Sequence, residues 1–331
     1  MKKIIPLLLL VSNASFAQLP TQQKATQFDK FINKPQIEWA AYINDTIRFE
    51  KINLNKLLFS RLVKNEIKIS LPVGSGSDEA NQIRYLNKKS IDEKLLYQKN
   101  QIAIFDSLGN MIDKIQSVAV KIDTNTFTLT DATQILYVEN GLLKTYTPWV
   151  ATMRPVTTST GIYLGEGDFF STCFNFNYAY QAPKQNKILF LSQSKRKMRL
   201  DSFDVRSKLK ELYGRNLIQT LWPYILKNKI EVFDYAKKRK LKTEDLTTDL
   251  VNEVKIEVPI YDSTGNQVGT KFVQEPLSPD VFTSMELVQD WYYDQTKNIV
   301  FTKIKEMILY ISKSNNDGLE EPVPVIKLVF K

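Results

Sequence analysis

The sequence predicts an α+β fold of two related small units, each with a helix, a strand, a β-hairpin and closing strands, joined by a β-rich connection. Residues 53–70 match residues 216–233 without a gap, with six identical positions. The turn-like stretch Ile104–Asn110 recurs as Ile260–Asn266. Because the two blocks recur in the same order, they indicate an internal duplication.

Each unit is predicted to begin with an amphipathic helix. Both helices should end at a Lys-Asn pair, Lys64-Asn65 and Lys227-Asn228, since a cation is favourable at the negative helix end and Asn tolerates a left-handed cap. Pro223 lacks the N–H that a helix interior uses, so the second helix should kink or restart there. The apolar faces comprise Leu54, Leu57, Leu58, Leu62 and Val63 in the first copy, and Leu217, Ile218, Leu221, Trp222, Ile225 and Leu226 in the second.

Strands and a hairpin are predicted to follow each helix. Apolar residues alternate at Ile67 and Ile69 in the first copy and at Ile230 and Val232 in the second, which is typical of a strand. Asp, Gly and Asn in the two Asp-Ser-x-Gly-Asn stretches supply the chemistry of a tight hairpin turn.

The remaining β-rich stretches close the units and connect them. Residues 134–156 align weakly with residues 286–311, which supplies the closing strands. Pro322-Val323-Pro324 begins a tail that we expect to pack as a final edge strand. Aromatic residues alternate within the connection and predict a strand or an ordered crossing: Phe174, Phe176, Tyr178 and Tyr180.

The start of the chain has the three-part pattern of a secretory signal peptide. Lys2 and Lys3 precede the apolar residues 4–11, and Ala17 ends a short polar stretch that suits cleavage. The apolar run is far below the roughly 20 residues that span a bilayer, so we expect export to the periplasm without a transmembrane span. The predicted divisions are a signal peptide (1–17), a first unit (18–156), a connecting segment (157–201) and a second unit (202–331).

The amino-acid composition excludes most common kinds of catalytic site. The 331 residues include no histidine and one cysteine, Cys173. Histidine is the usual general base near neutral pH and the commonest metal ligand. Its absence excludes Ser-His-Asp and Cys-His nucleophilic sites, and a single cysteine excludes thiolate-rich zinc sites and internal disulfides. The sequence therefore predicts no catalytic residues, no metal site and no cofactor.

Three local motifs resemble catalytic signatures only superficially. Asp262-Ser263-Thr264-Gly265 has one residue too many for an aspartic-protease loop, and Ser192–Lys195 lacks the Lys-Thr-Gly partner of penicillin-recognising enzymes. The glycine-rich stretch Gly161–Gly167 lacks the Lys of a phosphate loop and is predicted to form a turn between strands. Glu166 and Asp168 leave open a less favoured alternative, a carboxylate-based secreted glycoside hydrolase.

The formal net charge of +9 at pH 7 gathers in two basic clusters. Most charge runs form solvated surface, but in an exported protein such clusters can also bind anionic envelope material. A second alternative is therefore a periplasmic module that binds peptidoglycan or a lipid surface, with no role for nucleic acid. The clusters comprise Lys195, Arg196, Lys197 and Arg199, and Lys237, Lys238, Arg239, Lys240 and Lys242.

Two aromatic groups are candidate partner-interface residues: Trp222 with Tyr224, and Trp291 with Tyr292 and Tyr293. Aromatic side chains are enriched at protein interfaces. Core packing is an alternative of equal weight, because both groups sit beside periodic apolar positions.

Three segments resemble the GldN family of gliding motility and type IX secretion components. They are Gln289–Ile304, with its acidic-Trp-Tyr-Tyr-Asp cluster, Leu221–Asp234, and Lys51–Lys56 ahead of Leu71-Pro72. Thr302-Lys303 stands where the family pattern has an Arg. The resemblance implies a non-catalytic periplasmic subunit that assembles with an outer-membrane lipoprotein of GldK type into a homo- and hetero-oligomeric ring.

Overall fold

The computed structural model describes residues 27–70, 85–157, 162–175, 177, 180, 187–200, 208–248, 255–274, 277–314 and 319–330. The predicted signal peptide lies outside these residues. The described chain is mostly antiparallel β-structure with short helices, which is an α+β protein as expected.

The first half of the chain builds most of a five-stranded antiparallel sheet, called the N-terminal sheet. Its strand order is β6-β5-β4-β1-β8, and β8 is the one strand from the second half. The strands are β1 (Ile37–Ile47), β4 (Thr130–Glu139), β5 (Leu142–Thr157), β6 (Tyr163–Thr172) and β8 (Lys208–Glu211).

The second half builds a six-stranded antiparallel sheet, called the C-terminal sheet, in the order β10-β9-β15-β14-β13-β7. The expectation of a final edge strand holds only for the first part of β15, Glu320–Pro324, because Ile326–Val329 pairs with β9 as well as with β14. The strands are β7 (Ile188–Arg199), β9 (Glu231–Asp234), β10 (Lys240–Leu241), β13 (Phe282–Asp294), β14 (Ile299–Ser314) and β15 (Glu320–Val329).

The two predicted helices are confirmed as α2 (Leu54–Val63) and α4 (Leu217–Leu226). Asn53 and Asn216 cap their N-termini through side-chain oxygens. Asn65 and Asn228 follow the C-termini in the left-handed conformation, with φ of 57° and 54°. Pro223 lies inside α4, so the helix does not restart there. A capping box at its start and a buried apolar face hold it together.

Three short helices and three 3₁₀ turns lie outside the sheets in the described chain. They are α1 (Gln27–Ile32), α3 (Lys88–Lys94), α5 (Thr243–Thr248) and the 3₁₀ turns η2 (Thr124–Thr126), η4 (Leu212–Gly214) and η6 (Pro279–Val281).

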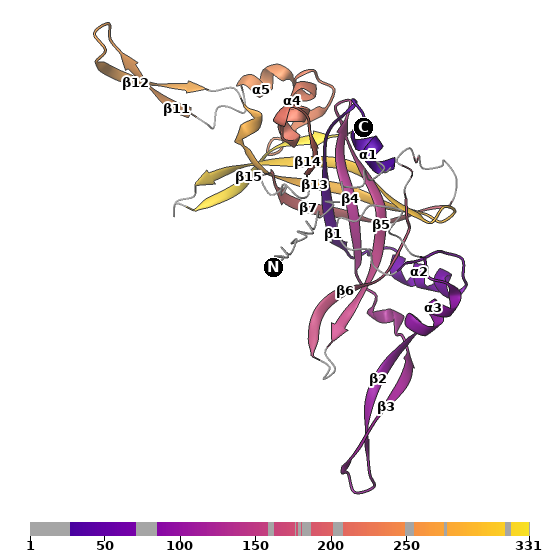
Figure 1. Ribbon diagram of the computed structural model, residues 1–331. Coiled ribbons are helices and arrows are strands. Elements are labelled where there is room, and N and C mark those ends of the chain that lie inside the picture. Colours follow the sequence, from indigo (N-terminus) through magenta and orange to yellow (C-terminus); the bar gives the residue numbers. More distant parts are fainter. Residues whose placement is uncertain are drawn as a thin grey trace, which may run out of the picture.

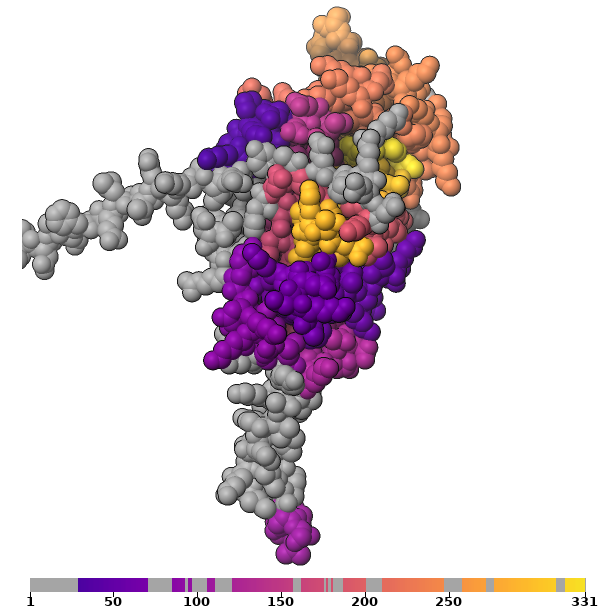
Figure 2. Space-filling model, turned by 90° about the vertical axis from the view of Figure 1, so that its right-hand side faces the viewer, coloured from indigo at the N-terminus to yellow at the C-terminus, as the bar shows by residue number. Residues whose placement is uncertain are grey.

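Both predicted hairpins are confirmed, and neither joins a larger sheet. In each turn the first Asp accepts backbone hydrogen bonds from the residues two and four positions later: Asp106 from Leu108 and Asn110, and Asp262 from Thr264 and Asn266. Figure 1 shows the hairpins at opposite ends of the molecule, and Figure 2 shows the first hairpin's turn well away from the body. The strands are β2 (Tyr97–Phe105), β3 (Met111–Lys121), β11 (Lys255–Tyr261) and β12 (Gln267–Gln274).

The two halves place their elements in the same order. In chain order, the first half has β1, α2, β2–β3, β4, β5 and β6, and the corresponding elements of the second half are β7, α4, β11–β12, β13, β14 and β15. The corresponding strands also have the same order in the two sheets, β6-β5-β4-β1 and β15-β14-β13-β7. The strand expected at Ile67 and Ile69 is reduced to bridges from Ser70 to Ser171 and to Tyr85. The stretch 157–201, expected to connect the units, contributes β6 to one sheet and β7 to the other.

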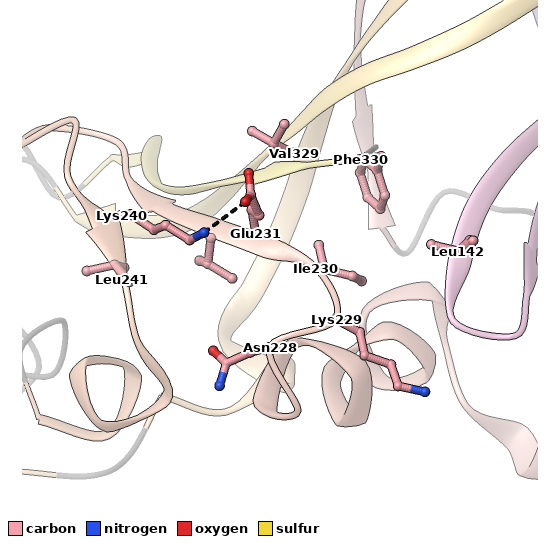
Figure 3. A pocket seen from close by; sticks show the side chains of 10 residues that line it. Leu142, Asn228, Lys229, Ile230, Glu231, Lys240, Leu241, Val329 and Phe330 are labelled. Atoms are coloured by element: carbon pink, nitrogen blue, oxygen red, sulfur yellow. Dashed lines mark hydrogen bonds and ion pairs between the residues drawn. The ribbon is translucent and has the colours of Figure 1, made fainter.

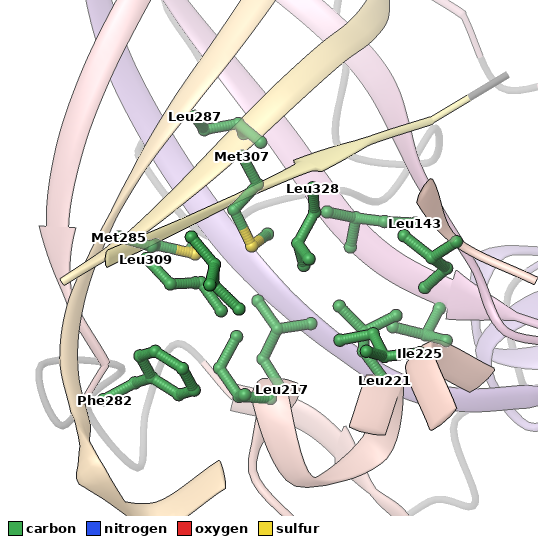
Figure 4. Close-up of a cluster of buried hydrophobic side chains, with 14 of the residues drawn as sticks. Leu143, Leu217, Leu221, Ile225, Phe282, Met285, Leu287, Met307, Leu309 and Leu328 are labelled. Atoms are coloured by element: carbon green, nitrogen blue, oxygen red, sulfur yellow. The ribbon is translucent and has the colours of Figure 1, made fainter. Parts of the chain in front are cut away.

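The two sheets pack against each other, and the helices α4 and α2 pack against both of them. One apolar cluster joins α4 to both sheets and includes Leu143, Leu221 and Met307 (Figure 4). A second cluster joins α2 to both sheets and includes Leu58, Val150 and Trp291. These two clusters are therefore shared by the two halves, whereas a third, smaller cluster that includes Phe31, Ile135 and Tyr137 lies within the first half.

Candidate partner-binding surfaces

Trp291 and Tyr293 lie in the interior, with 0% of each side chain exposed. Both point inward from β13, on the face that packs against α2 and the N-terminal sheet. The Trp291 indole donates a hydrogen bond to Ser194 Oγ at 2.8 Å, and the Tyr293 hydroxyl donates to Asn298 Oδ1 at 2.9 Å. In the folded chain these two side chains are core, in line with the alternative that the sequence left open.

Trp222 and Tyr224 pack within the chain as well. The Trp222 ring lies 6.0 Å from the Phe282 ring. The Tyr224 hydroxyl donates to Glu38 at 2.7 Å, and burial together with this carboxylate raises the pKa of Tyr224 to about 12. The Tyr224 ring also lies against Gly141 in the β4–β5 turn. Tyr224 thus holds α4 against the N-terminal sheet.

Tyr292 is the predicted aromatic residue that lies on the outer face of the C-terminal sheet. Its ring stacks on Phe301 at 5.3 Å and meets Phe190 edge-on at 5.5 Å, so three strands carry one aromatic row. Lys303 lies over the Tyr292 ring and Lys51 over the Phe190 ring. Burial and the Asp290 carboxylate raise the pKa of Tyr292. Half-buried aromatic rings beside lysines form a surface suited to a protein contact.

Several polar contacts between the halves were not foreseen from the sequence. Arg61 on α2 donates to the Tyr293 hydroxyl and, at 3.0 Å, to the Gln295 carbonyl. Thr145 and Thr302 share a hydrogen bond across the two sheets, and Arg196 pairs with Asp45 at 3.6 Å. No motif marks these positions, because each contact joins residues more than a hundred positions apart.

Four residues of the basic clusters form ion pairs with acids of the same chain: Arg196, Lys237, Arg239 and Lys240. Beside the Arg196 pair, Lys197 lies 4.3 Å from the centre of the Tyr310 ring. In the second cluster Lys237 faces Asp234, Arg239 faces Asp245 and Lys240 faces Glu231, at 3.9, 3.8 and 2.8 Å. These ion pairs are therefore internal contacts around β9 and β10. They reduce the positive electrostatic potential that the lysines and arginines present to an anionic surface.

Glu166 and Asp168 lie two residues apart on β6, and so on the same face of the strand. Glu166 accepts from the Tyr163 hydroxyl at 3.3 Å. Burial raises the pKa of Asp168, and burial together with the Asp168 charge raises the pKa of nearby Asp131 to about 6. Among the residues described, no group of three or more His, Cys, Asp or Glu side chains is arranged to hold a metal ion.

Cys173 follows β6 and is fully buried. Burial raises the pKa of its thiol well above the ordinary value, so the thiol stays protonated at neutral pH. It donates a long hydrogen bond to Asn298. A protonated buried thiol is a poor nucleophile, which agrees with a packing role for this residue.

A cavity of about 310 Å³ lies where the end of α4 meets β9, β10, β15 and the β4–β5 turn (Figure 3). Its charged groups include the Lys240–Glu231 ion pair, at 2.8 Å, and Lys229. None of the five predicted aromatic interface residues lines it, but Lys240 of the second basic cluster does. The lining residues are Leu142, Asn228, Lys229, Ile230, Glu231, Val232, Lys240, Leu241, Val329 and Phe330.

The fold and its surfaces define an α+β protein of two packed antiparallel sheets with projecting hairpins. Residues 183–328 match the family described as gliding motility associated protein GldN. The match extends over α4 and nearly all of the C-terminal sheet, and in this part the chain is similar to the GldN family of gliding motility associated proteins. No curated protein sequence matches the chain. Within the described ranges, no helix is long and apolar enough to cross a membrane.

Proposed function

We propose that this protein is a non-catalytic periplasmic structural subunit of a gliding motility and type IX secretion complex. It assembles with an outer-membrane lipoprotein of GldK type into a homo- and hetero-oligomeric ring. The observation that carries the proposal is the GldN match, because residues 183–328 include α4 and nearly all of the C-terminal sheet. The half-exposed aromatic row around Tyr292 lies in this same region and supports a contact role.

The proposed route to the periplasm is a signal peptide over residues 1–17, cleaved after Ala17. The pattern of charged, apolar and small residues supports it. N-terminal sequencing of the protein purified from the periplasm should begin at Gln18. A protein recovered from the cytoplasm with Met1 retained would contradict this step.

We further propose that the halves arose by duplication, with units of about 37–172 and 188–329 that include β6 and β7. Contacts between the halves support it, because they join equivalent positions. Thr145 and Thr302 each lie three residues after the start of β5 or β14, and they touch each other. Asp45 and Arg196 each lie eight residues after the start of β1 or β7, and they form an ion pair.

The helices make reciprocal contacts in the same way. Arg61 and Tyr224 each lie seven residues after the start of their helix. Arg61 reaches the β13–β14 turn at Gln295, and Tyr224 reaches the β4–β5 turn at Gly141. Such reciprocity is the pattern of a two-fold symmetric, isologous interface. The halves therefore relate to each other as two subunits of a fused dimer.

The function is tested by affinity purification from the envelope of a gliding bacterium that carries this gene. We expect the protein to elute with the lipoprotein in a complex many times the 38.3 kDa of the chain. Deletion of the gene should stop secretion of surface adhesins, and the wild-type gene should restore it. A monomer without the lipoprotein, together with normal secretion in the deletion strain, would refute the proposal.

A further inference from the structure

The paired ends of β5 and β6 carry the largest run of exposed apolar side chains that the structure describes. Ile162, Tyr163 and Leu164 are 64%, 59% and 65% exposed, and Val156 on the facing strand is 41% exposed. Thr157 pairs with Tyr163 in the ladder, so these side chains share one tip. Figure 1 shows the tip extending from the N-terminal sheet beyond the body of the molecule. Contiguous exposed apolar groups of this kind mark interaction sites.

The glycine-rich stretch explains the shape of the tip. The stretch 161–167 is predicted to form a turn between strands, but its residues 163–167 form the start of β6. Gly165 has a φ of +131°, which L-residues rarely adopt, and an added Cβ at Gly167 would lie 2.8 Å from Val156. Glycines at these two alternate positions leave one face of β6 without side chains at residues 165 and 167, so the strand pair is thin there.

The equivalent tip in the other half has a different chemistry. The ends of β14 and β15 pair Lys313 with Glu321 and Ser314 with Glu320. Leu319 is the exposed large apolar residue beside them, at 64%. Two strand ends in matching positions therefore differ, since one is charged and the other is apolar.

A carboxylate beside the apolar tip has an unsatisfied oxygen. Glu166 Oε1 accepts from Tyr163, but Oε2 is shielded from solvent and has no hydrogen-bond partner among the described residues. A shielded carboxylate oxygen without a donor is unfavourable, and a charged donor would satisfy it. Asp168 adds a second negative charge on the same face of β6.

We propose that the β5–β6 tip inserts into an apolar groove of a partner protein, where an arginine or lysine at the groove's rim pairs with Glu166. The negative charges of Glu166 and Asp168 favour this occupant over an anionic lipid surface, which they would repel. The inference rests on the proposed function, in which the chain docks onto other proteins of its complex.

The test measures binding of the full chain to the purified lipoprotein partner by calorimetry. We expect the double variant Ile162→Ser/Leu164→Ser to bind roughly 10-fold to 100-fold more weakly, because it removes apolar anchors. The matched control Leu319→Ser, at the charged tip, should bind as the wild type does. Thermal unfolding of all variants should be unchanged, since these side chains are largely exposed. Glu166→Gln should bind about 10-fold more weakly without loss of stability.

The possible outcomes separate the two proposals. A wild-type chain that does not bind the lipoprotein overturns the proposed function, and the inference with it. If the wild-type chain binds the lipoprotein and the double variant binds it equally well, only the inference about the β5–β6 tip is overturned. Binding of the wild type to phosphatidylglycerol vesicles, lost in the double variant, overturns it in favour of a lipid surface. Unchanged affinity of Glu166→Gln contradicts the proposed cation at the rim.

Discussion

Gly141 in the β4–β5 turn is the glycine at which an added methyl group should reduce the stability of the fold most. Its φ is +76°, and an added Cβ would lie 2.1 Å from the Tyr224 ring. We expect Gly141→Ala to lower the free energy of unfolding by about 3 kcal/mol or more, because strain in the backbone adds to a clash that separates α4 from the turn. Urea unfolding followed by tryptophan fluorescence measures this loss.

Gly265 provides the matched control, because its φ is +85° and nothing lies within 4 Å of an added Cβ. Gly265→Ala should therefore lower the free energy of unfolding by only about 1 kcal/mol, the cost of the backbone strain alone. If both variants lost the same stability, the contact between Gly141 and Tyr224 would not be a close one.

Asp131 should make stability depend on pH. Its pKa is raised from 3.8 to about 6, first by burial and then by the Asp168 and Asp45 charges. The folded state thus binds the proton more tightly than the unfolded state, so the free energy of unfolding falls as pH rises from about 4 to about 6. Asp131→Asn removes this fall, and with solvent screening we expect a gain of the order of 1 kcal/mol at pH 7.

The measurement is thermal unfolding of both proteins between pH 4 and pH 7. The two melting temperatures should agree best at the acidic end, where the wild-type carboxyl is protonated. A variant that is less stable than the wild type at pH 7 would show that the Asp131 charge is stabilising.

Among the elements, α4 depends on its N-terminal cap. The Asn216 side chain accepts from the Gln219 N–H at 2.8 Å, and the Gln219 side chain accepts from the Asn216 N–H at 2.8 Å. We expect Asn216→Ala to lower the free energy of unfolding by about 1 kcal/mol, with Asn216→Asp close to the wild type. Chemical denaturation of the three proteins checks this. Equal losses in both variants would point to a role other than capping.

The helices and hairpins could be predicted because their signals are local. Asn53, Asn65 and the Asp-Ser-x-Gly-Asn turns determine where these elements begin and end through contacts a few residues apart. The position of β15 could not be predicted, because pairing with both β14 and β9 depends on distant strands. Pro322 and Pro324 predicted an edge, and they do lie at one, because the short strand β9 pairs only with Ile326–Val329.

For the whole molecule, the contact between Thr145 and Thr302 offers a direct test of how the halves meet. In the double variant Thr145→Cys/Thr302→Cys, we expect oxidation to form a disulfide within one chain, since the two hydroxyls touch. Closing so long a loop should stabilise the protein by up to about 4 kcal/mol. Non-reducing electrophoresis should show a faster-migrating monomer. Disulfide-linked dimers would indicate that the halves pair between chains.

The aromatic candidates show the limit of sequence reasoning at this scale. Trp291, Tyr292 and Tyr293 are adjacent, and alternation along a strand predicts that Tyr292 faces away from its neighbours. The sequence could not say which side would be covered. Packing against α2 and the N-terminal sheet buries Trp291 and Tyr293 and leaves Tyr292 on the outer face.

By itself the sequence determined the α+β class, two helices with their caps, two hairpins and the resemblance to GldN, because each rests on local chemistry or on a linear pattern. Only the tertiary structure decided that β6 and β7 belong to the sheets, that equivalent residues of the halves touch, and which aromatic rings reach the surface. These depend on contacts between residues far apart in the chain, and strand register and burial are settled only when the sheets pack together.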